Sequence, residues 1–439
     1  MSSKIVLNYP GPFTWSSHKD TIPVLKEIWT ECGAEIIDVW HPINTNLSFD
    51  FKKIISSDVL VFPLGQQQNN AMASLCYLRK FGWKGHSLIM IAGEGILKYR
   101  QLSSNLNYLS DKDTFIFNSS REKEVFRSHF SDQFKTCVIP LPINEKVFNC
   151  DLYDDRNSIR EDFKILTSDK VILYAGRVST QKNIVSLLTI LNMLRETDNN
   201  WKLIIAGSYD DLGVPYMENS KAPYLYEINY WMNHLKLKDS VRFLDSLEPS
   251  ELSRLMFASD VYLSATLHCS EDFGLSVSQA VSMKVPCLTT YWGGGVDFID
   301  KGQVGKIPVF YTENGLKIDY RSAYKSALQA INTRPVLENY FSNKSIKGKW
   351  RNLIEGNFEP TLNFKPSQSS IDLSGKDFFK CFSLSYGALA VESTKPDRFY
   401  LNPHWVESSK HLFDPLAFKR SFPDQFDSKK MGIELPDLS

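Results

Sequence analysis

A short loop of the sequence combines a glycine with two basic residues. Gly176 ends a run of apolar residues, and Arg177 and Lys182 follow it just before a segment of helical periodicity. A helix start carries unpaired amide groups and binds anions. Arginine adds a fork of donors for two phosphate oxygens, and lysine adds a point charge. The loop predicts a phosphate or diphosphate site, although two solvated surface cations would explain this loop alone equally well.

A second cluster places an acidic residue just ahead of a glycine and another helix. Glu271 precedes Phe273, Gly274 and Leu275, and Gln279 lies one to two turns into the predicted helix. A carboxylate at this place can accept hydrogen bonds from sugar hydroxyls, and the backbone amides near the glycine can meet a phosphate. The alternative is that the acidic residue only favours the helix N-terminus electrostatically.

A third cluster consists of three consecutive glycines, residues 293–295, followed by Asp297. Glycines at the end of a strand suggest that the backbone passes close to a ligand, although such a run is more typical of a flexible loop. All three clusters follow predicted strands of one domain. Because parallel strands end at the same edge of a sheet, we expect the clusters to converge there.

The elements that must position these clusters follow an α/β rhythm. Short apolar runs alternate with amphipathic segments up to about residue 145, and the rhythm restarts at Val171. This alternation predicts parallel sheets, and strands without polar alternation are covered on both faces. The predicted strands are 4–8, 35–39, 58–63, 87–92, 114–118, 171–175, 201–206, 241–244, 261–265 and 286–290.

The predicted fold class is therefore α/β, with two Rossmann-like domains that face a cleft and a C-terminal extension. The extension is rich in proline, serine and phenylalanine, and its many aromatic residues argue against disorder. We expect it to pack on the two domains, on a protein partner or at a membrane surface. The predicted parts are an N-terminal domain (1–145), an interdomain linker (146–168), a C-terminal domain (169–339), a crossover helix (340–358) and the extension (359–439).

The composition excludes several classes of protein. The chain has 439 residues and a formal net charge of zero, so it gives no general reason to bind a nucleic acid. Its seven cysteines stand singly, which argues against a zinc module and a disulfide framework. No secretory signal or membrane-spanning run is evident. We therefore expect a cytoplasmic protein.

The three clusters together resemble a known family. G-R-x-x-x-x-K, E-D-F-G-L and G-G-G-V-D, in this order, are similar to the motifs of the retaining glycosyltransferases of family GT4, the glycosyl transferases group 1, which have the GT-B fold. The resemblance is strong over residues 169–305, weaker over 4–148 and absent from the extension. It implies a nucleotide-sugar donor, a UDP- or GDP-sugar above all, on the C-terminal domain. The acceptor, a glycan, a lipid-linked glycan or a protein, would approach from the N-terminal domain.

The resemblance also implies roles for individual residues. Arg177 and Lys182 would bind the donor diphosphate and neutralise the leaving group without a metal or other cofactor, which counts them with Glu271 as the catalytic residues. Glu271 would hold the hydroxyls of the donor sugar. The backbone at Gly176 and at 273–275 would contact the donor, and attack on one face of the sugar would retain its anomeric configuration.

Two positions depart from the family pattern. The family usually has a second glutamate eight residues after the first, on the nucleotide ribose, and this chain has the neutral Gln279 there. The loop after the first strand has a single glycine, Gly11, between prolines in place of a glycine pair. Glu94 and His268 are further candidates for the acceptor side of the cleft.

Two other classes of function compete with an active transferase. A catalytically inactive GT-B protein could serve as the binding subunit of a transferase complex, and the glutamine at position 279 motivates this alternative. A dinucleotide oxidoreductase is weakened by the absence of a G-x-G-x-x-G turn after the first strand. The donor sugar, the base, the acceptor, the linkage and the oligomeric state do not follow from the sequence.

Overall fold

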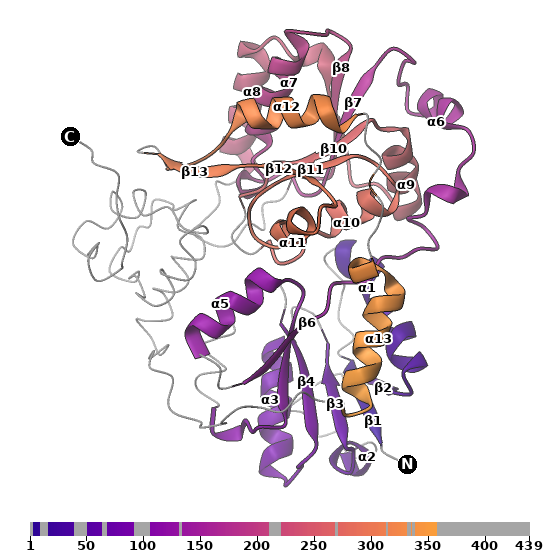
Figure 1. The fold of residues 1–439 in the computed structure, drawn as a ribbon, viewed down its shortest axis with the longest axis vertical. Helices are drawn as coiled ribbons and strands as arrows, with labels where there is room; N and C mark the ends of the chain where they lie inside the picture. Colours follow the sequence, from indigo (N-terminus) through magenta and orange to yellow (C-terminus); the bar gives the residue numbers. More distant parts are fainter. Residues whose placement is uncertain are drawn as a thin grey trace, which may run out of the picture. The chain divides into compact units, whose positions relative to one another are not determined.

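The computed structural model divides the chain into two compact units. Unit 1 contains Met1–Pro142 and the segment that begins at Asn339, and unit 2 contains Ile143–Glu338. Both are sheets covered by helices (Figure 1). The structure describes residues 3–8, 16–38, 51–63, 68–91, 106–130, 134–209, 221–267, 271–312, 315–331, 335 and 339–357.

The core of unit 1 is a six-stranded parallel sheet with the order β2-β1-β3-β4-β5-β6. Its central strands are apolar and buried, as expected where helices cover both faces. The strands are β1 (Lys4–Asn8), β2 (Glu35–Asp38), β3 (Val59–Phe62), β4 (His86–Ile91), β5 (Asp113–Phe117) and β6 (Lys135–Val138). The helices are α1 (Ser16–Glu31), α2 (Phe51–Ile55), η1 (Leu106–Tyr108), α3 (Gln68–Lys80) and α5 (Ser120–Phe130).

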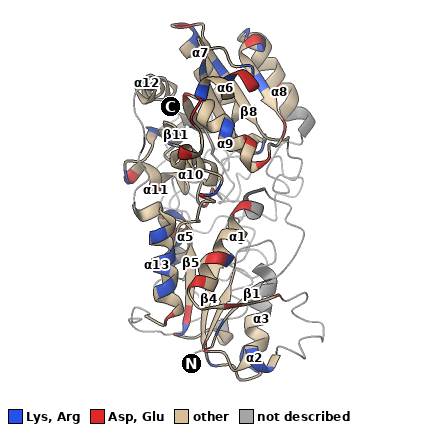
Figure 2. Cartoon of the chain, turned by 90° about the vertical axis from the view of Figure 1, so that its right-hand side faces the viewer, with Lys and Arg blue, Asp and Glu red and all other residues tan. Residues whose placement is uncertain are grey.

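The last described helix, α13 (Asn343–Ile354), returns to unit 1 after the whole of unit 2 and follows the short η6 (Asn339–Phe341). Ile346, Trp350 and Ile354 recur every four residues on one buried face of α13. Trp350 meets Trp29 of α1 edge to face, with ring centroids 5.3 Å apart. The other faces of α13 carry lysine and arginine, drawn blue in Figure 2.

Unit 2 is built on a second six-stranded parallel sheet with the order β12-β11-β10-β7-β8-β9. Its strands are β7 (Lys170–Ala175), β8 (Trp201–Ala206), β9 (Val241–Leu244), β10 (Val261–Ser264), β11 (Cys287–Thr290) and β12 (Gly305–Ile307). An antiparallel hairpin pairs β13 (Val309–Thr312) with β14 (Gly315–Ile318). The helices are η3 (Cys150–Leu152), α6 (Arg156–Asp162), η4 (Thr180–Lys182), α7 (Ile184–Arg195), α8 (Lys221–His234), η5 (Lys238–Ser240), α9 (Pro249–Ala258), α10 (Leu275–Ser282), α11 (Gly295–Asp300) and α12 (Tyr320–Ala330).

The strand order of unit 2 creates a topological switch point. From the central β7 the chain proceeds to β8 and β9 on one side, and then returns to build β10, β11 and β12 on the other side. The loops that follow β7 and β10 therefore leave the same edge of the sheet in opposite directions. Ligands of open α/β sheets bind at such a point.

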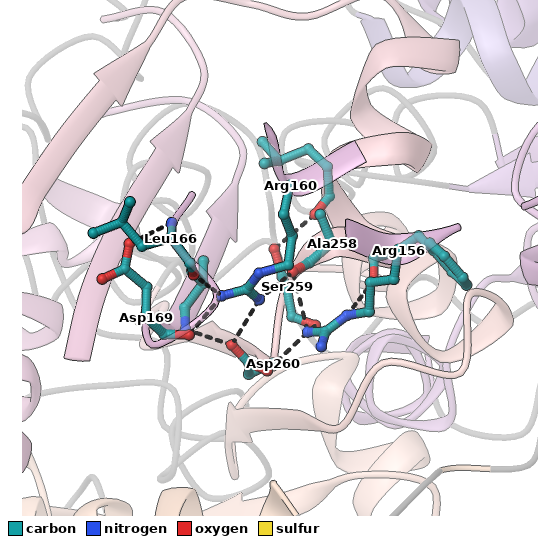
Figure 3. Close-up of polar contacts among 10 residues, drawn as sticks. Arg156, Arg160, Leu166, Asp169, Ala258, Ser259 and Asp260 are labelled. Atoms are coloured by element: carbon teal, nitrogen blue, oxygen red, sulfur yellow. Dashed lines mark hydrogen bonds and ion pairs between the residues drawn. The ribbon is translucent and has the colours of Figure 1, made fainter. Parts of the chain in front are cut away.

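A buried charge cluster fixes α6 to the end of α9. Figure 3 shows Arg156 and Arg160 of α6 pointing toward Asp260 and toward backbone carbonyls. Arg160, whose side chain is 3% exposed, donates to the carbonyl oxygens of Ala258 at 2.9 Å and Leu166 at 2.8 Å. The guanidinium thus satisfies a carbonyl at the C-terminus of α9, where helices lack internal partners and favour cations.

The same cluster reaches the first strand of the unit 2 sheet. Asp260 accepts hydrogen bonds from Arg156 at 2.7 Å and from the amide of Val171, in β7, at 2.7 Å. One carboxylate thereby ties together α6, the start of β7 and the residue just before β10. The helix α6 is thereby anchored at the N-terminal ends of β7 and β10, the two strands whose following loops carry the candidate site.

Among the helices that the structure describes, none is both long enough and apolar enough to cross a membrane.

Candidate functional site

The loop after β7 begins with a close approach between two chain segments. The amide of Gly176 donates to the carbonyl of Ala206 at 2.9 Å, and φ of Gly176 is +152°. Gly207, at the end of β8, has φ of +150°, and a Cβ there would collide with the carbonyl oxygen of Gly176. Glycine is thus required at position 207, because the two backbones touch there.

Asn183, the residue after Lys182, is held in place by two side-chain hydrogen bonds. Asn183 adopts the left-handed conformation, with φ of 57°, between the short helix η4 and α7. Its side-chain amide nitrogen donates to the backbone carbonyl of Ala265 at 3.1 Å, and its side-chain oxygen accepts from the hydroxyl of Ser186 at 2.8 Å. Asparagine tolerates this backbone better than most residues. The sequence reasoning missed Asn183, because its partner Ala265 follows a different strand.

Lys182 and Glu271, two of the residues singled out in the sequence, meet at the switch point. The ammonium group of Lys182 donates to Oε2 of Glu271, and each side chain is 15% exposed. Thr266, which follows β10, donates to the same oxygen at 3.2 Å. The loops after β7 and β10 thus present one cation and one carboxylate side by side.

The electrostatics of the site keep the carboxylate ionised. Burial alone would raise the pKa of Glu271, but the charge and hydrogen bond of Lys182, the hydroxyl of Thr266 and the charge of Arg177 outweigh it and lower the pKa. Arg177 is half-buried. Two cations, Lys182 and Arg177, therefore act on the carboxylate of Glu271 in a partly desolvated site.

The glycines at 293–295 have a role that the sequence did not suggest. Gly293 has φ of +53°, and a Cβ there would lie 2.5 Å from the carbonyl oxygen of Glu271. The amide of Gly294 donates to that same oxygen at 2.5 Å. This loop packs against the backbone of Glu271, so its glycines serve to seat the acidic residue.

The segment after Glu271 turns directly into α10. Gly274 has φ of +86° and precedes the first residue of the helix, Leu275. The side chain of Phe273 is buried against Phe298, with ring centroids 5.2 Å apart, which leaves its backbone for any contact with a ligand. Gln279 lies in the second turn of α10 with 5% of its surface exposed.

Three of the candidates, Gly11, Glu94 and His268, lie outside the residues that the structure describes.

Comparison with known sequences identifies the domain that holds this site. Residues 155–326 match the sequence model of the glycosyl transferases group 1. This segment belongs to the glycosyl transferases group 1 family. The group 1 domain includes Arg177, Lys182, Glu271 and Gln279, and the resemblance inferred from the motifs is confirmed.

Curated relatives match over part of the chain. The alpha-monoglucosyldiacylglycerol synthase of Streptococcus pneumoniae is 25% identical over 183 residues, which cover 41% of this chain and 38% of the relative. An uncharacterized glycosyltransferase of Methanocaldococcus jannaschii is 26% identical over 209 residues, 47% of this chain and 49% of the relative. The similarity to these two relatives thus spans less than half of their length.

Solved structures are similar in fold to a larger part of the chain, which includes both units. Anabaena HepE, solved in complex with UDP-glucose, aligns with a TM-score of 0.54 and 14% identity over 81% of this chain and 100% of its own. A glycosyltransferase from Rickettsia africae aligns with a TM-score of 0.53 and 16% identity over 82% and 94% of the two chains. The predicted α/β fold with two Rossmann-like domains is confirmed as the GT-B fold.

Proposed function

We propose that this chain is a glycosyltransferase that transfers a sugar from a nucleotide-sugar to an acceptor hydroxyl. The observation that carries the proposal is the meeting of Lys182 and Glu271 at the switch point of a group 1 domain, with Arg177 close enough to lower the pKa of Glu271. Cations for a diphosphate and a carboxylate for sugar hydroxyls are the two kinds of group that a nucleotide-sugar requires.

Donor binding exchanges the partners of the ion pair. The diphosphate offers Lys182 an anion of higher charge than Glu271 does, and Arg177 adds a bidentate contact. The oxygen of Glu271 that Lys182 occupies then becomes free to accept from sugar hydroxyls. The backbone at Gly176 and at 273–275 contacts the donor, and Gln279 contacts the ribose as a neutral acceptor.

The same cations promote the chemical step. The bond between the anomeric carbon and the diphosphate oxygen breaks, and negative charge grows on the leaving diphosphate. Arg177 and Lys182 stabilise that charge, which lowers the barrier without a metal ion. The acceptor oxygen bonds to the anomeric carbon on the face that the diphosphate leaves, so the configuration is retained, and the acceptor's proton passes to the departing diphosphate oxygen.

The proteins that this chain resembles suggest which donors and acceptors it uses. A UDP-sugar is the first donor to test and a GDP-sugar the second, since HepE was solved with UDP-glucose. The acceptor is a glycan, a lipid-linked glycan or a protein. One relative is named for a glucosyldiacylglycerol and another, from Staphylococcus aureus, for capsular polysaccharide. Residues 359–439 are the proposed contact to a membrane surface or a protein partner.

The cysteines support a reducing compartment, and we place the reaction in the cytoplasm. Among the residues that the structure describes, none of Cys32, Cys76, Cys137, Cys150 and Cys287 is part of a disulfide. Disulfides are rare in the cytosol, where thiols remain reduced.

The deciding experiment measures nucleotide release from a panel of UDP- and GDP-sugars, with and without glycan acceptors. Wild-type protein should release UDP or GDP, and Lys182→Ala and Arg177→Ala should each lose most of the turnover without unfolding. Lys284→Ala is the matched control, because that lysine belongs to the same unit but pairs with exposed Asp151. Full activity in Lys182→Ala would contradict the diphosphate assignment.

The neutral Gln279 supports a second candidate function. A ribose contact through an amide is weaker than one through a carboxylate, and such a domain could bind a nucleotide-sugar, or only its partner, without turnover. Binding of UDP without any nucleotide release would favour this binding subunit over the enzyme.

A further inference from the structure

Two buried tyrosines lie beneath the loops of the site. Tyr174 belongs to β7 and Tyr262 to β10, neighbouring strands of the sheet, and their exposed fractions are 1% and 0%. Burial raises the pKa of both phenols, so both hydroxyls keep their protons at neutral pH. Buried hydroxyls need hydrogen-bond partners, and these two find theirs in the segments that form the site.

The Tyr174 hydroxyl holds the loop that carries Arg177. It donates to the carbonyl oxygen of Arg177 at 2.8 Å. The loop passes directly over this hydroxyl, since a Cβ on Gly176 would lie 2.9 Å from it. A side chain at position 176 would therefore crowd this hydroxyl, so the position favours glycine.

The Tyr262 hydroxyl links the end of β7 to the start of α10. It lies 3.2 Å from the carbonyl oxygen of Ala175 and 2.7 Å from the hydroxyl oxygen of Ser276. A carbonyl oxygen can only accept, so the single phenolic proton goes to Ala175, and the Ser276 hydroxyl donates to the phenol. Ala175 ends β7 and Ser276 stands in the first turn of α10.

We propose that Tyr174 and Tyr262 are positioning residues that fix the distance between the backbone of Arg177 and the N-terminus of α10. Neither side chain touches the ligand. They hold the backbone of Arg177 and the N-terminus of α10 in place before the diphosphate arrives, so less ordering is left for the binding step. The inference rests on the proposed function in one respect, that the anion is the diphosphate of a nucleotide-sugar.

The test removes the hydroxyls and keeps the rings. Tyr174→Phe and Tyr262→Phe should each weaken UDP binding by about five- to tenfold in calorimetry, the loss typical of one hydrogen bond. The KM for UDP-sugar should rise by a similar factor. Tyr153→Phe is the matched control, because Tyr153 bonds to buried Ser253 at 2.6 Å on α9 of the same unit. Its UDP affinity should equal that of wild type.

Double-mutant cycles separate positioning from a merely structural contribution. If Tyr174 acts through Arg177, Tyr174→Phe should cost little in UDP affinity once Arg177→Ala is present. Tyr262→Phe and Ser276→Ala should likewise lose no more together than either loses alone. Additive losses would overturn the inference, as would a wild-type Kd in both phenylalanine variants.

Two measurements keep this result distinct from the proposed function. Urea unfolding of each variant shows whether the phenylalanine proteins remain folded. Ser276→Ala removes the hydrogen bond to Tyr262 without substituting a buried tyrosine. If wild-type protein binds neither UDP nor GDP, the proposed function is wrong and the premise of the inference falls with it. If wild type binds and the variants bind equally well, only the inference is wrong.

Discussion

At the scale of single residues, Glu271 both supports and restrains the site. It pairs with Lys182, and in the proposed function it releases that lysine when the diphosphate binds. Sequence reasoning identified both residues, because a strand followed by a charged residue and a helix is a local pattern. It missed Thr266 and Asn183, since their contacts depend on which strands are neighbours.

We predict that Glu271→Gln separates nucleotide binding from turnover. Glutamine removes a negative charge beside the diphosphate, so UDP should bind roughly three- to tenfold more tightly at low salt. Sugar transfer should fall, because a neutral amide holds the sugar hydroxyls more weakly. Calorimetry with UDP and a transfer assay provide the two readings. Weaker UDP binding would contradict the exchange of partners.

The lowered pKa of Glu271 predicts a pH-dependent stability. A carboxyl whose pKa is lower in the folded than in the unfolded protein stabilises the fold above its unfolded pKa, near the ordinary 4.5. That contribution disappears as the pH falls through the lower folded pKa. The difference in unfolding midpoint between wild type and Glu271→Gln should therefore be larger at pH 7 than at pH 3. An unchanged difference would show that the ion pair does not stabilise the domain.

At the scale of elements, the predicted strands of both units appear within a residue or two of their observed bounds. Apolar runs without polar alternation were correctly predicted as strands, because helices cover both faces of these sheets. The order of the strands was not predicted. That β10 lies beside β7, and thereby brings Glu271 to Lys182, depends on packing between segments distant in sequence.

The charge cluster on α6 was also beyond sequence reasoning, because Arg156 and Arg160 are distant in the sequence from their partner Asp260. Arg160→Met should destabilise unit 2 by about 3 kcal/mol or more, because it leaves Asp260 and several carbonyls with fewer partners in a buried place. Urea unfolding followed by fluorescence measures the change.

The matched control is Arg254→Met. Arg254 pairs with Asp162, and their side chains are 38% and 55% exposed, so this change should cost less than about 1 kcal/mol. Equal effects of the two substitutions would show that the Arg160 cluster is no more than a surface ion pair.

At the scale of the whole molecule, the polypeptide leaves unit 1 and comes back to it. The contact between Trp29 and Trp350 joins residues from opposite ends of the described chain. Trp350→Ala should destabilise unit 1 by roughly 3–5 kcal/mol, the usual cost of deleting a buried large aromatic ring. Limited proteolysis should then cut unit 1 earlier than unit 2. Faster cleavage of unit 2 would contradict this assignment.

The return of α13 has a consequence for synthesis. The ribosome releases the chain from its N-terminus, and domains generally fold as units as they emerge. All described residues of unit 2 fall in the single stretch Ile143–Glu338, so this stretch can fold as soon as it is released. The apolar residues of α1 that pack in one core with Ile346, Trp350 and Ile354 stay without these partners until the last of the three has emerged. Among the residues that the structure describes, the last to be made are therefore those of α13, which belong to unit 1.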